Sequence, residues 1–314
     1  MPNLLEVRNL SKDFHTKKGL LQAVNDITFD VRRGETLGIV GESGCGKSTT
    51  GRAVLRLVEP TSGEVRFDGQ DILAYGARKM REARKDMQII FQDPFASLNP
   101  RLSISQIIAE PFDVYRMYSP GERAQRVLEL MRTVGLSNKL VNAFPHELDG
   151  GRRQRVGVAR ALALNPKFIV CDEPVSALDV SIQAQILNLI QDLQQKLDLT
   201  YMFISHDLSV VKHISNRVAV MYLGKIVELT TSRKIFTNPL HPYTQALLSA
   251  IPLPKVGVEK RRRIILEGDV PSPINPPTGC IFCGRCPFVM AKCRETPPPM
   301  VEAESDHFVS CYLL

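Results

Sequence analysis

Short apolar runs recur along the chain, separated by stretches with helical spacing. Three of them, residues 37–40, 167–174 and 200–205, are largely apolar without alternation, which is typical of strands buried in a parallel sheet. Residues 87–91 add a fourth strand, and residues 218–228 indicate a closing hairpin. Helical patterns occur at residues 50–57, 75–85, 156–164 and 182–197. This alternation predicts an α/β fold.

Three regions depart from that alternation. Residues 4–31 alternate polar and apolar positions in the manner of a strand pair. Residues 96–150 give amphipathic helical patterns broken by proline and glycine, so we expect a helical insertion. Beyond residue 238 prolines dominate, and this small extension has little room for a core of its own. A metal ion would help to hold it together.

The turn after the strand at residues 37–40 fits the phosphate-loop pattern G-x-x-x-x-G-K-[ST]. Its glycines allow the backbone to curl so that successive N–H groups face one concavity, and the following helix adds the positive end of its dipole. Lys47 is expected to contact the β- and γ-phosphates, and Ser48 to offer its hydroxyl to Mg²⁺. The nucleotide-binding residues predicted here are Gly41, Glu42, Ser43, Gly44, Cys45, Gly46, Lys47, Ser48 and Thr49.

Polar residues stand where the predicted parallel strands end, which is the edge at which such sheets bind ligands. Gln92 follows one strand and can reach a metal-bound water or the γ-phosphate, although such a residue is often only a polar loop residue. Asp172 and Glu173 end another strand, where Asp172 would hold Mg²⁺ through water and Glu173 would polarise the attacking water. His206 ends a third strand and can hydrogen-bond a γ-phosphate. The predicted Mg²⁺ ligands are Ser48, Gln92 and Asp172.

Composition narrows the class of protein without naming a partner. The chain is 44% hydrophobic and 23% charged, as in ordinary globular proteins, and its net charge of +7 suits nucleotides, anionic membrane surfaces or nucleic acid alike. No apolar run approaches the roughly 18 residues of a membrane helix, and no signal peptide opens the chain. We therefore expect a cytosolic or peripheral protein. Five of its seven cysteines crowd the last tenth of the sequence, which in a cytosolic protein indicates a metal site.

Taken together, these motifs resemble the ATPase subunits of ABC transporters, in the peptide-importer branch (dipeptide and oligopeptide, with nickel importers close by) and its second-ATPase type. The resemblance covers residues 1–235 through the phosphate loop, Gln92 as the Q-loop, LDGGR at 148–152 where the family has LSGGQ, IVCDEP at 169–174, SALD at 176–179 as the D-loop, and His206 as the switch histidine. Residues 240–247 and the cysteine-rich tail resemble the C-terminal extension of that branch.

The resemblance implies a P-loop NTPase cassette with a RecA-like parallel core and N-terminal antiparallel strands, a helical subdomain and a small C-terminal metal-binding extension. The corresponding domains are a nucleotide-binding core of residues 1–95 and 151–237, a helical subdomain of residues 96–150, and an extension of residues 238–314. It also implies that Phe14 stacks on adenine and that two cassettes sandwich two ATP molecules head to tail. The residues implied to face the partner's nucleotide are Asp149, Gly150, Gly151, Arg152 and Asp179.

One residue departs from the family pattern in a way that matters chemically. The signature serine donates a hydrogen bond to the partner's γ-phosphate, and here Asp149 occupies that position. An ionised carboxylate cannot donate and would repel a triphosphate, although the positive charge of Arg152 partly compensates. We expect this subunit to pair with a different ATPase whose signature is intact.

The tail cysteines admit two metals. The resemblance implies that Cys280, Cys286, Cys293 and Cys311 hold a [4Fe–4S] cluster, with Cys283 as an extra thiol. Thiolates at these spacings also suit Zn²⁺, which we rank second.

The implied function is an ATP hydrolase that powers the import of dipeptides or oligopeptides from the cytoplasmic face of the membrane. Its implied partners are a second ABC ATPase, two transmembrane permease subunits and, indirectly, a substrate-binding protein, but no nucleic acid. A nickel or other chelate cargo is one alternative. Another is a soluble ABC ATPase acting on nucleic acid or ribosomes, but such proteins carry tandem cassettes or long coiled-coil insertions, which this chain lacks.

Overall fold

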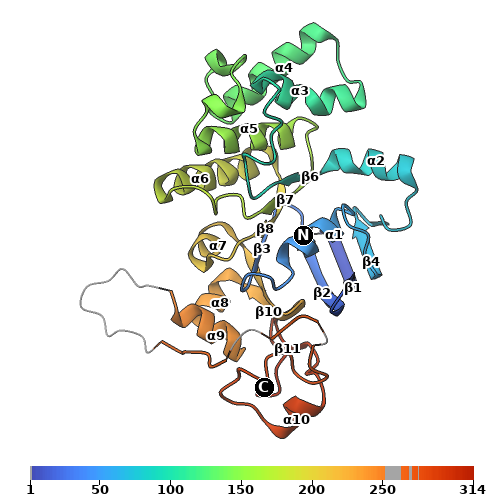
Figure 1. The fold of residues 1–314 in the computed structure, drawn as a ribbon, viewed down its shortest axis with the longest axis vertical. Coiled ribbons are helices and arrows are strands. Elements are labelled where there is room, and N and C mark those ends of the chain that lie inside the picture. Colours follow the sequence, from blue (N-terminus) through green and yellow to red (C-terminus); the bar gives the residue numbers. More distant parts are fainter. Residues whose placement is uncertain (1, 252–262, 269–270, 275) are drawn as a thin grey trace, which may run out of the picture. The chain divides into compact units, whose positions relative to one another are not determined.

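A computed structural model describes residues 2–251, 263–268, 271–274 and 276–314 (Figure 1). The chain divides into two compact units. The first unit comprises residues 32–34 and 74–204, and the second unit comprises residues 2–31, 35–73 and 205–314. These units group residues differently from the predicted core, helical subdomain and extension, and that division stays a prediction.

The second unit contains two layers of strands. An antiparallel sheet has the order β2-β1-β4-β5, with β1 (Asn3–Thr16) and β4 (Ser62–Phe67) paired antiparallel. The other strands of this layer are β2 (Gly19–Arg32) and β5 (Gln70–Asp71). The strand pair predicted within residues 4–31 is present as β1 and β2.

The second layer carries the phosphate loop. Its strands have the order β11-β12-β10-β9-β3. The parallel pair is β3 (Thr36–Val40) with β9 (Arg217–Tyr222), and every residue of both strands is buried, as their apolar runs predicted. The antiparallel members are β10 (Lys225–Thr231), β12 (His307–Val309) and β11 (Val301–Glu304). The helices of this unit are α1 (Lys47–Val54), α7 (Leu208–Ile214), α8 (Ser232–Thr237), α9 (Pro242–Ser249) and α10 (Ala291–Glu295).

The first unit pairs three parallel strands with a group of helices (Figure 1). The strands have the order β8-β7-β6, namely β8 (Thr200–Ile204), β7 (Phe168–Asp172) and β6 (Met87–Ile90). The helices are α2 (Ala77–Asp86), α3 (Ile104–Tyr115), α4 (Pro120–Thr133), α5 (Gly150–Leu162) and α6 (Val180–Leu197), with short 3₁₀ turns η1 (Asn138–Leu140) and η2 (Pro145–Glu147).

Capping residues define the helical insertion that the sequence predicted. Ser103 and Gln106 form a capping box at the start of α3, and Ser119 and Glu122 form another at the start of α4. The apolar faces of α3, α4 and α5 pack against one another. At the start of α3 the Ser103 hydroxyl accepts from the N–H of Gln106 over 3.4 Å, and at the start of α4 the Glu122 carboxylate accepts from the N–H of Ser119 over 2.8 Å.

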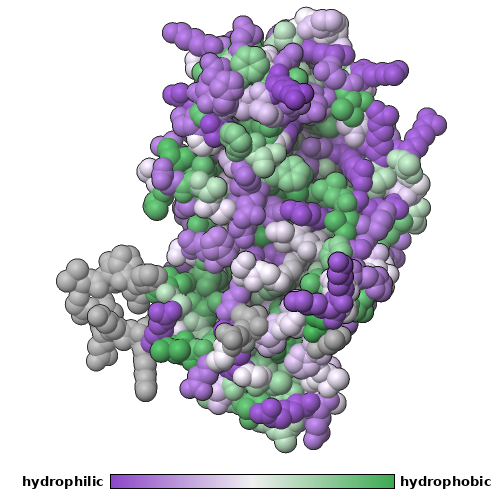
Figure 2. Space-filling model, in the orientation of Figure 1, coloured by the Kyte–Doolittle hydropathy of each residue, from purple (hydrophilic) through white to green (hydrophobic). Residues whose placement is uncertain are grey.

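Within the described residues, no helix combines the length and the apolar character needed to cross a bilayer. Figure 2 shows hydrophilic and hydrophobic side chains interspersed over the visible face.

The C-terminal extension is attached through the sheet and through a buried polar group. Strand β12 adds to β10, and Nε2 of His307 lies 2.8 Å from Oε1 of Glu228, with both side chains fully buried. The same carboxylate accepts hydrogen bonds from the backbone N–H groups of Leu240 (2.8 Å) and His241 (3.0 Å). Glu228 thus joins three segments of the second unit, and its hydrogen-bonding capacity is well used.

Replacing Glu228 tests this attachment. In Glu228→Gln one acceptor oxygen becomes a donor that faces buried N–H groups, so the free energy of unfolding should fall by about 2–3 kcal/mol. The measurement is the urea midpoint of the transition. Glu267→Gln, the same change at an exposed site of the extension, is the control and should lie within about 0.5 kcal/mol of wild type. Equal midpoints for both variants would show that Glu228 does not hold the extension.

Candidate functional site

The phosphate loop between β3 and α1 runs so close to its neighbours that two glycines are required. A Cβ on Gly41 would lie 2.2 Å from the carbonyl oxygen of Met221, and one on Gly46 would lie 2.0 Å from that of Ala23. Gly46 is also the N-cap of α1 and adopts φ 101°, which favours glycine. The backbone therefore forms the tight strand-to-helix turn that the sequence predicted.

Lys47 is held over this loop. Its side chain is 4% exposed, and Nζ donates to the carbonyl oxygens of Gly41 (2.8 Å) and Glu42 (3.0 Å). The ammonium thus stays at the start of α1, where the helix dipole also favours an anion. The nearby Cys45 thiol is buried, and burial raises its pKa, so it stays neutral.

Phe14 lies on β1 in the same unit as the phosphate loop. Its ring is 38% exposed, and Lys12 Nζ lies 4.9 Å from the ring centroid. An exposed aromatic ring on a strand is available for stacking, and its role toward adenine stays a prediction.

In the first unit the structure brings Gln92 and Glu173 together. Gln92 Nε2 donates to Glu173 Oε2 over 2.9 Å, and these residues follow the neighbouring parallel strands β6 and β7. Glu173 has φ 47°, an uncommon conformation for a residue with a side chain, and its N–H donates to the carbonyl of Ile204 (3.0 Å). The preceding Asp172 is 1% exposed at the end of β7. A residue with an uncommon backbone conformation beside a buried carboxylate is typical of an active site.

Asp149 has a local role that the sequence analysis missed. It is the N-cap of α5, and its side chain accepts from the N–H of Arg152 over 2.7 Å. Arg152 Nε also lies 3.3 Å from Asp149 Oδ2, in a pair whose side chains are more than half exposed and which contributes little energy. Behind them, a Cβ on Gly151 would lie 2.6 Å from Cγ2 of Ile182, so α5 packs tightly against α6.

The D-loop turn folds back on Glu173. Ser176 Oγ donates to the carbonyl of Glu173 over 3.1 Å, and Asp179 is the N-cap residue of α6. His206, two residues after the end of β8, is exposed. Glu173 and Ser176 lie in two consecutive family motifs, at 169–174 and 176–179. Nothing in those motifs predicted a hydrogen bond between them.

Two residues of the extension contact the phosphate loop, and the sequence analysis assigned neither of them. Tyr243 Oη accepts from the N–H of Glu42 (3.0 Å), and Arg285 Nη1 donates to Glu42 Oε2 (2.9 Å). Tyr243 falls within the stretch 240–247 that carried the family resemblance, which was the one available signal.

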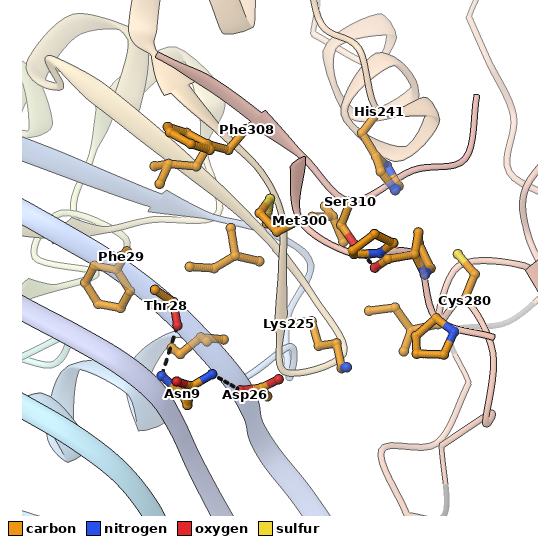
Figure 3. A pocket seen from close by; sticks show the side chains of 18 of the residues that line it. Asn9, Asp26, Thr28, Phe29, Lys225, His241, Cys280, Met300, Phe308 and Ser310 are labelled. Carbon is orange, nitrogen blue, oxygen red and sulfur yellow. Dashed lines mark hydrogen bonds between the residues drawn. The ribbon is translucent and has the colours of Figure 1, made fainter. Parts of the chain in front are cut away.

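A cavity of about 520 Å³ lies elsewhere in the second unit, between β1, β2, β10 and the extension (Figure 3). Ile27 and Phe29 line one wall, and Asn9 Nδ2 donates to Asp26 Oδ1 over 2.8 Å at another. None of its lining residues belongs to the predicted nucleotide site, so its size does not make it the site of the chemistry.

Two family descriptions match this chain. Residues 24–176 match the ABC transporter family, and residues 227–293 match the oligopeptide/dipeptide transporter C-terminal region.

Curated relatives align over nearly the whole chain. The oligopeptide transport ATP-binding protein AppF of Bacillus subtilis is 54% identical over 319 residues, covering 99% of this chain and 97% of the relative. The oligopeptide transport ATP-binding protein OppF of Salmonella typhimurium is 52% identical over 319 residues, covering 98% and 95%.

Solved structures share the fold. The dimeric ATP-binding cassette MJ0796, in a post-hydrolysis state bound to ADP and Pi, has a TM-score of 0.67 and 28% identity, covering 73% of this chain and 99% of that chain. The protein cbiO1 from Clostridium perfringens, part of the cbiONQ complex, has a TM-score of 0.66 and 28% identity, covering 76% and 92%.

The predicted iron–sulfur cluster, and with it the metal-binding character of the extension, is wrong. Among the residues that the structure describes, no three or more His, Cys, Asp or Glu side chains are arranged to hold a metal ion, and the named relatives are ATP-binding proteins without an iron–sulfur designation. The ranked alternative, Zn²⁺, has no support either. The four predicted ligands and the extra thiol Cys283 all line one small cavity, and none of them forms a disulfide. The four are Cys280, Cys286, Cys293 and Cys311.

The physical reason lies in the other attachments of the extension. The pairing of β12 with β10 and the buried Glu228–His307 contact attach the tail without a metal ion.

Proposed function

Because this chain belongs to the ABC transporter ATPases, in the branch with the oligopeptide/dipeptide transporter C-terminal region, we propose that it hydrolyses MgATP to power peptide import. The observation that carries this proposal is that each unit holds one preorganised group: a glycine-constrained loop around a buried Lys47 in the second unit, and a carboxylate, Glu173, that accepts from Gln92 in the first. The first binds phosphate and the second activates water.

The phosphate loop supplies the nucleotide contacts. Lys47 contacts the β- and γ-phosphates, the loop N–H groups surround them, and Phe14 stacks on adenine. Oxygen ligands for Mg²⁺ are present in the hydroxyl of Ser48, the amide of Gln92 and the buried carboxylate of Asp172, which is the donor set that this ion prefers. Mg²⁺ held by these residues would offset the negative charge of the phosphates.

Glu173 acts as the general base in this proposal, and His206 bonds the γ-phosphate. The hydrogen bond from Gln92 orients one oxygen of the Glu173 carboxylate, and the hydrogen bond from its N–H to Ile204 fixes the backbone. A base oriented in this way loses little freedom when water and phosphate arrive.

The chain acts within a larger assembly in this proposal. The related cassette MJ0796 is dimeric. The family resemblance implies that each signature in such a dimer faces the partner's nucleotide. Asp149 replaces the signature serine, which supports pairing with a second, different ATPase. The remaining partners are two membrane permeases contacted through residues 96–150 and, indirectly, a substrate-binding protein, with the chain peripheral on the cytoplasmic face.

The names of the relatives favour a peptide cargo over the alternatives. AppF and OppF are named for oligopeptide transport, and the C-terminal match is to oligopeptide/dipeptide transporters. These names do not support a nickel or other chelate cargo. They do not support an ATPase acting on nucleic acid or ribosomes either.

Glu173→Gln tests the proposed chemistry. In the assembled transporter the variant should lose ATP turnover by about 100-fold or more, because the amide cannot take a proton, while MgATP binding persists. Phosphate release and equilibrium nucleotide binding are measured on the same preparation. The control is Glu295→Gln at an exposed position of the extension, which should keep full turnover. Undiminished turnover in Glu173→Gln would remove Glu173 from the mechanism.

The signature residue tests the proposed pairing. The purified chain alone should be a poor ATPase, because Asp149 repels the triphosphate in a homodimer. Asp149→Ser restores a donor and remains a good helix N-cap, so it should raise the ATPase rate of the isolated chain about tenfold or more. Asp149→Ala, which removes the charge without adding a donor, is the matched control and should gain less. A wild-type chain that is fully active alone would contradict the heterodimer.

A further inference from the structure

Two side chains of the extension form hydrogen bonds with one residue of the phosphate loop, Glu42. Arg285 Nη1 donates to the Glu42 carboxylate over 2.9 Å, and Tyr243 Oη accepts from the Glu42 N–H over 3.0 Å. Both the backbone and the side chain of this loop residue are therefore held by residues that lie about 200 or more positions further along the chain.

Both contacts come from well-packed groups. Tyr243 is fully buried, with its ring centroid 4.7 Å from that of Tyr222 and 5.5 Å from that of Phe282. The N–H of Arg285 donates to the carbonyl of Phe282 over 3.0 Å, so a tight turn carries the guanidinium beside this aromatic cluster. Side chains whose neighbours are packed in this way lose little further entropy in holding Glu42.

Electrostatics gives the pair a role beyond attachment. A carboxylate within a phosphate loop repels the triphosphate that the loop is proposed to bind. The Arg285 side chain is 10% exposed and that of Glu42 is 26% exposed, so solvent screens their attraction less than on an open surface. The guanidinium thus offsets the charge of Glu42 where an anion must approach.

Attachment of the extension does not depend on this contact. Strand β12 pairs with β10, and Glu228 contacts His307, at a separate place in the second unit. A cavity of about 520 Å³ also lies between the extension and β1, β2 and β10, so the extension is not packed continuously against these strands (Figure 3). The contacts to Glu42 are therefore a specific connection to the loop.

We propose that Arg285 and Tyr243 are positioning residues for nucleotide binding, which act through Glu42 to hold the phosphate loop and to offset its negative charge. The inference rests on the proposed function, since it assigns these residues to the same nucleotide site. It gives the C-terminal extension a direct part in the affinity for nucleotide.

A double-mutant cycle on the full chain tests the charge role, with MgADP as the probe because it is not hydrolysed. Arg285→Met should weaken MgADP binding about tenfold, because the carboxylate of Glu42 is then uncompensated. The same substitution in a Glu42→Gln background should change the affinity less than about twofold, because no charge is left to offset. Arg294→Met, which removes an exposed cation from the same extension, is the control and should bind within about twofold of wild type.

The outcomes separate a positioning role from a structural one. An equal loss of affinity on removing Arg285 in both backgrounds, or a loss in neither, would overturn the charge role. Tyr243→Phe keeps the buried ring and removes only the acceptor of the Glu42 N–H, so it should weaken MgADP binding about fivefold. Unchanged affinity in Tyr243→Phe would remove Tyr243 from the proposal. A wild-type chain that does not bind MgADP would instead contradict the proposed function itself.

Discussion

The structure depends on how closely the backbone passes its neighbours at the phosphate loop. At Gly41 and Gly46 no side chain fits, because the carbonyl groups of Met221 and Ala23 occupy the space that a Cβ would need. The fully buried strand β3 leads into the phosphate loop, and α1 begins where the loop ends. A loop confined in this way can turn its N–H groups toward one anion without reorganising, which is the basis of binding and of electrostatic catalysis alike.

Much of this arrangement was predictable because it is encoded locally. The buried strands β3, β7 and β8 are apolar runs, and the sequence indicated that Gln92 and Glu173 follow strands of one parallel sheet, although it did not predict their hydrogen bond. The contacts of Tyr243 and Arg285 with Glu42 were not predictable, since they join residues about 200 or more positions apart with no local pattern. The N-cap role of Asp149 was not predicted, because the family signature implies a different role for this residue, facing the partner's nucleotide.

The cysteines are a case in which a local sequence pattern predicted a site that the structure does not show. Their crowding in the sequence predicts a ligand set, but the described residues contain no group of three or more His, Cys, Asp or Glu side chains arranged to hold a metal ion. The extension is attached instead by the pairing of β12 with β10 and by the buried Glu228 carboxylate. This carboxylate accepts from two backbone N–H groups and contacts His307. A lone buried Glu in a strand and a distant His carry no spacing that would identify them as partners.

Equilibrium binding of MgATP to Lys47→Ala tests the central claim most directly. Lys47 is nearly buried, and its ammonium is held over the carbonyl oxygens of the loop, so its loss removes a preorganised charge from the place where the phosphates are proposed to bind. The account predicts that affinity falls by about 100-fold or more while the thermal unfolding midpoint stays close to that of wild type. Undiminished affinity in this variant would contradict both the site and the function assigned to it.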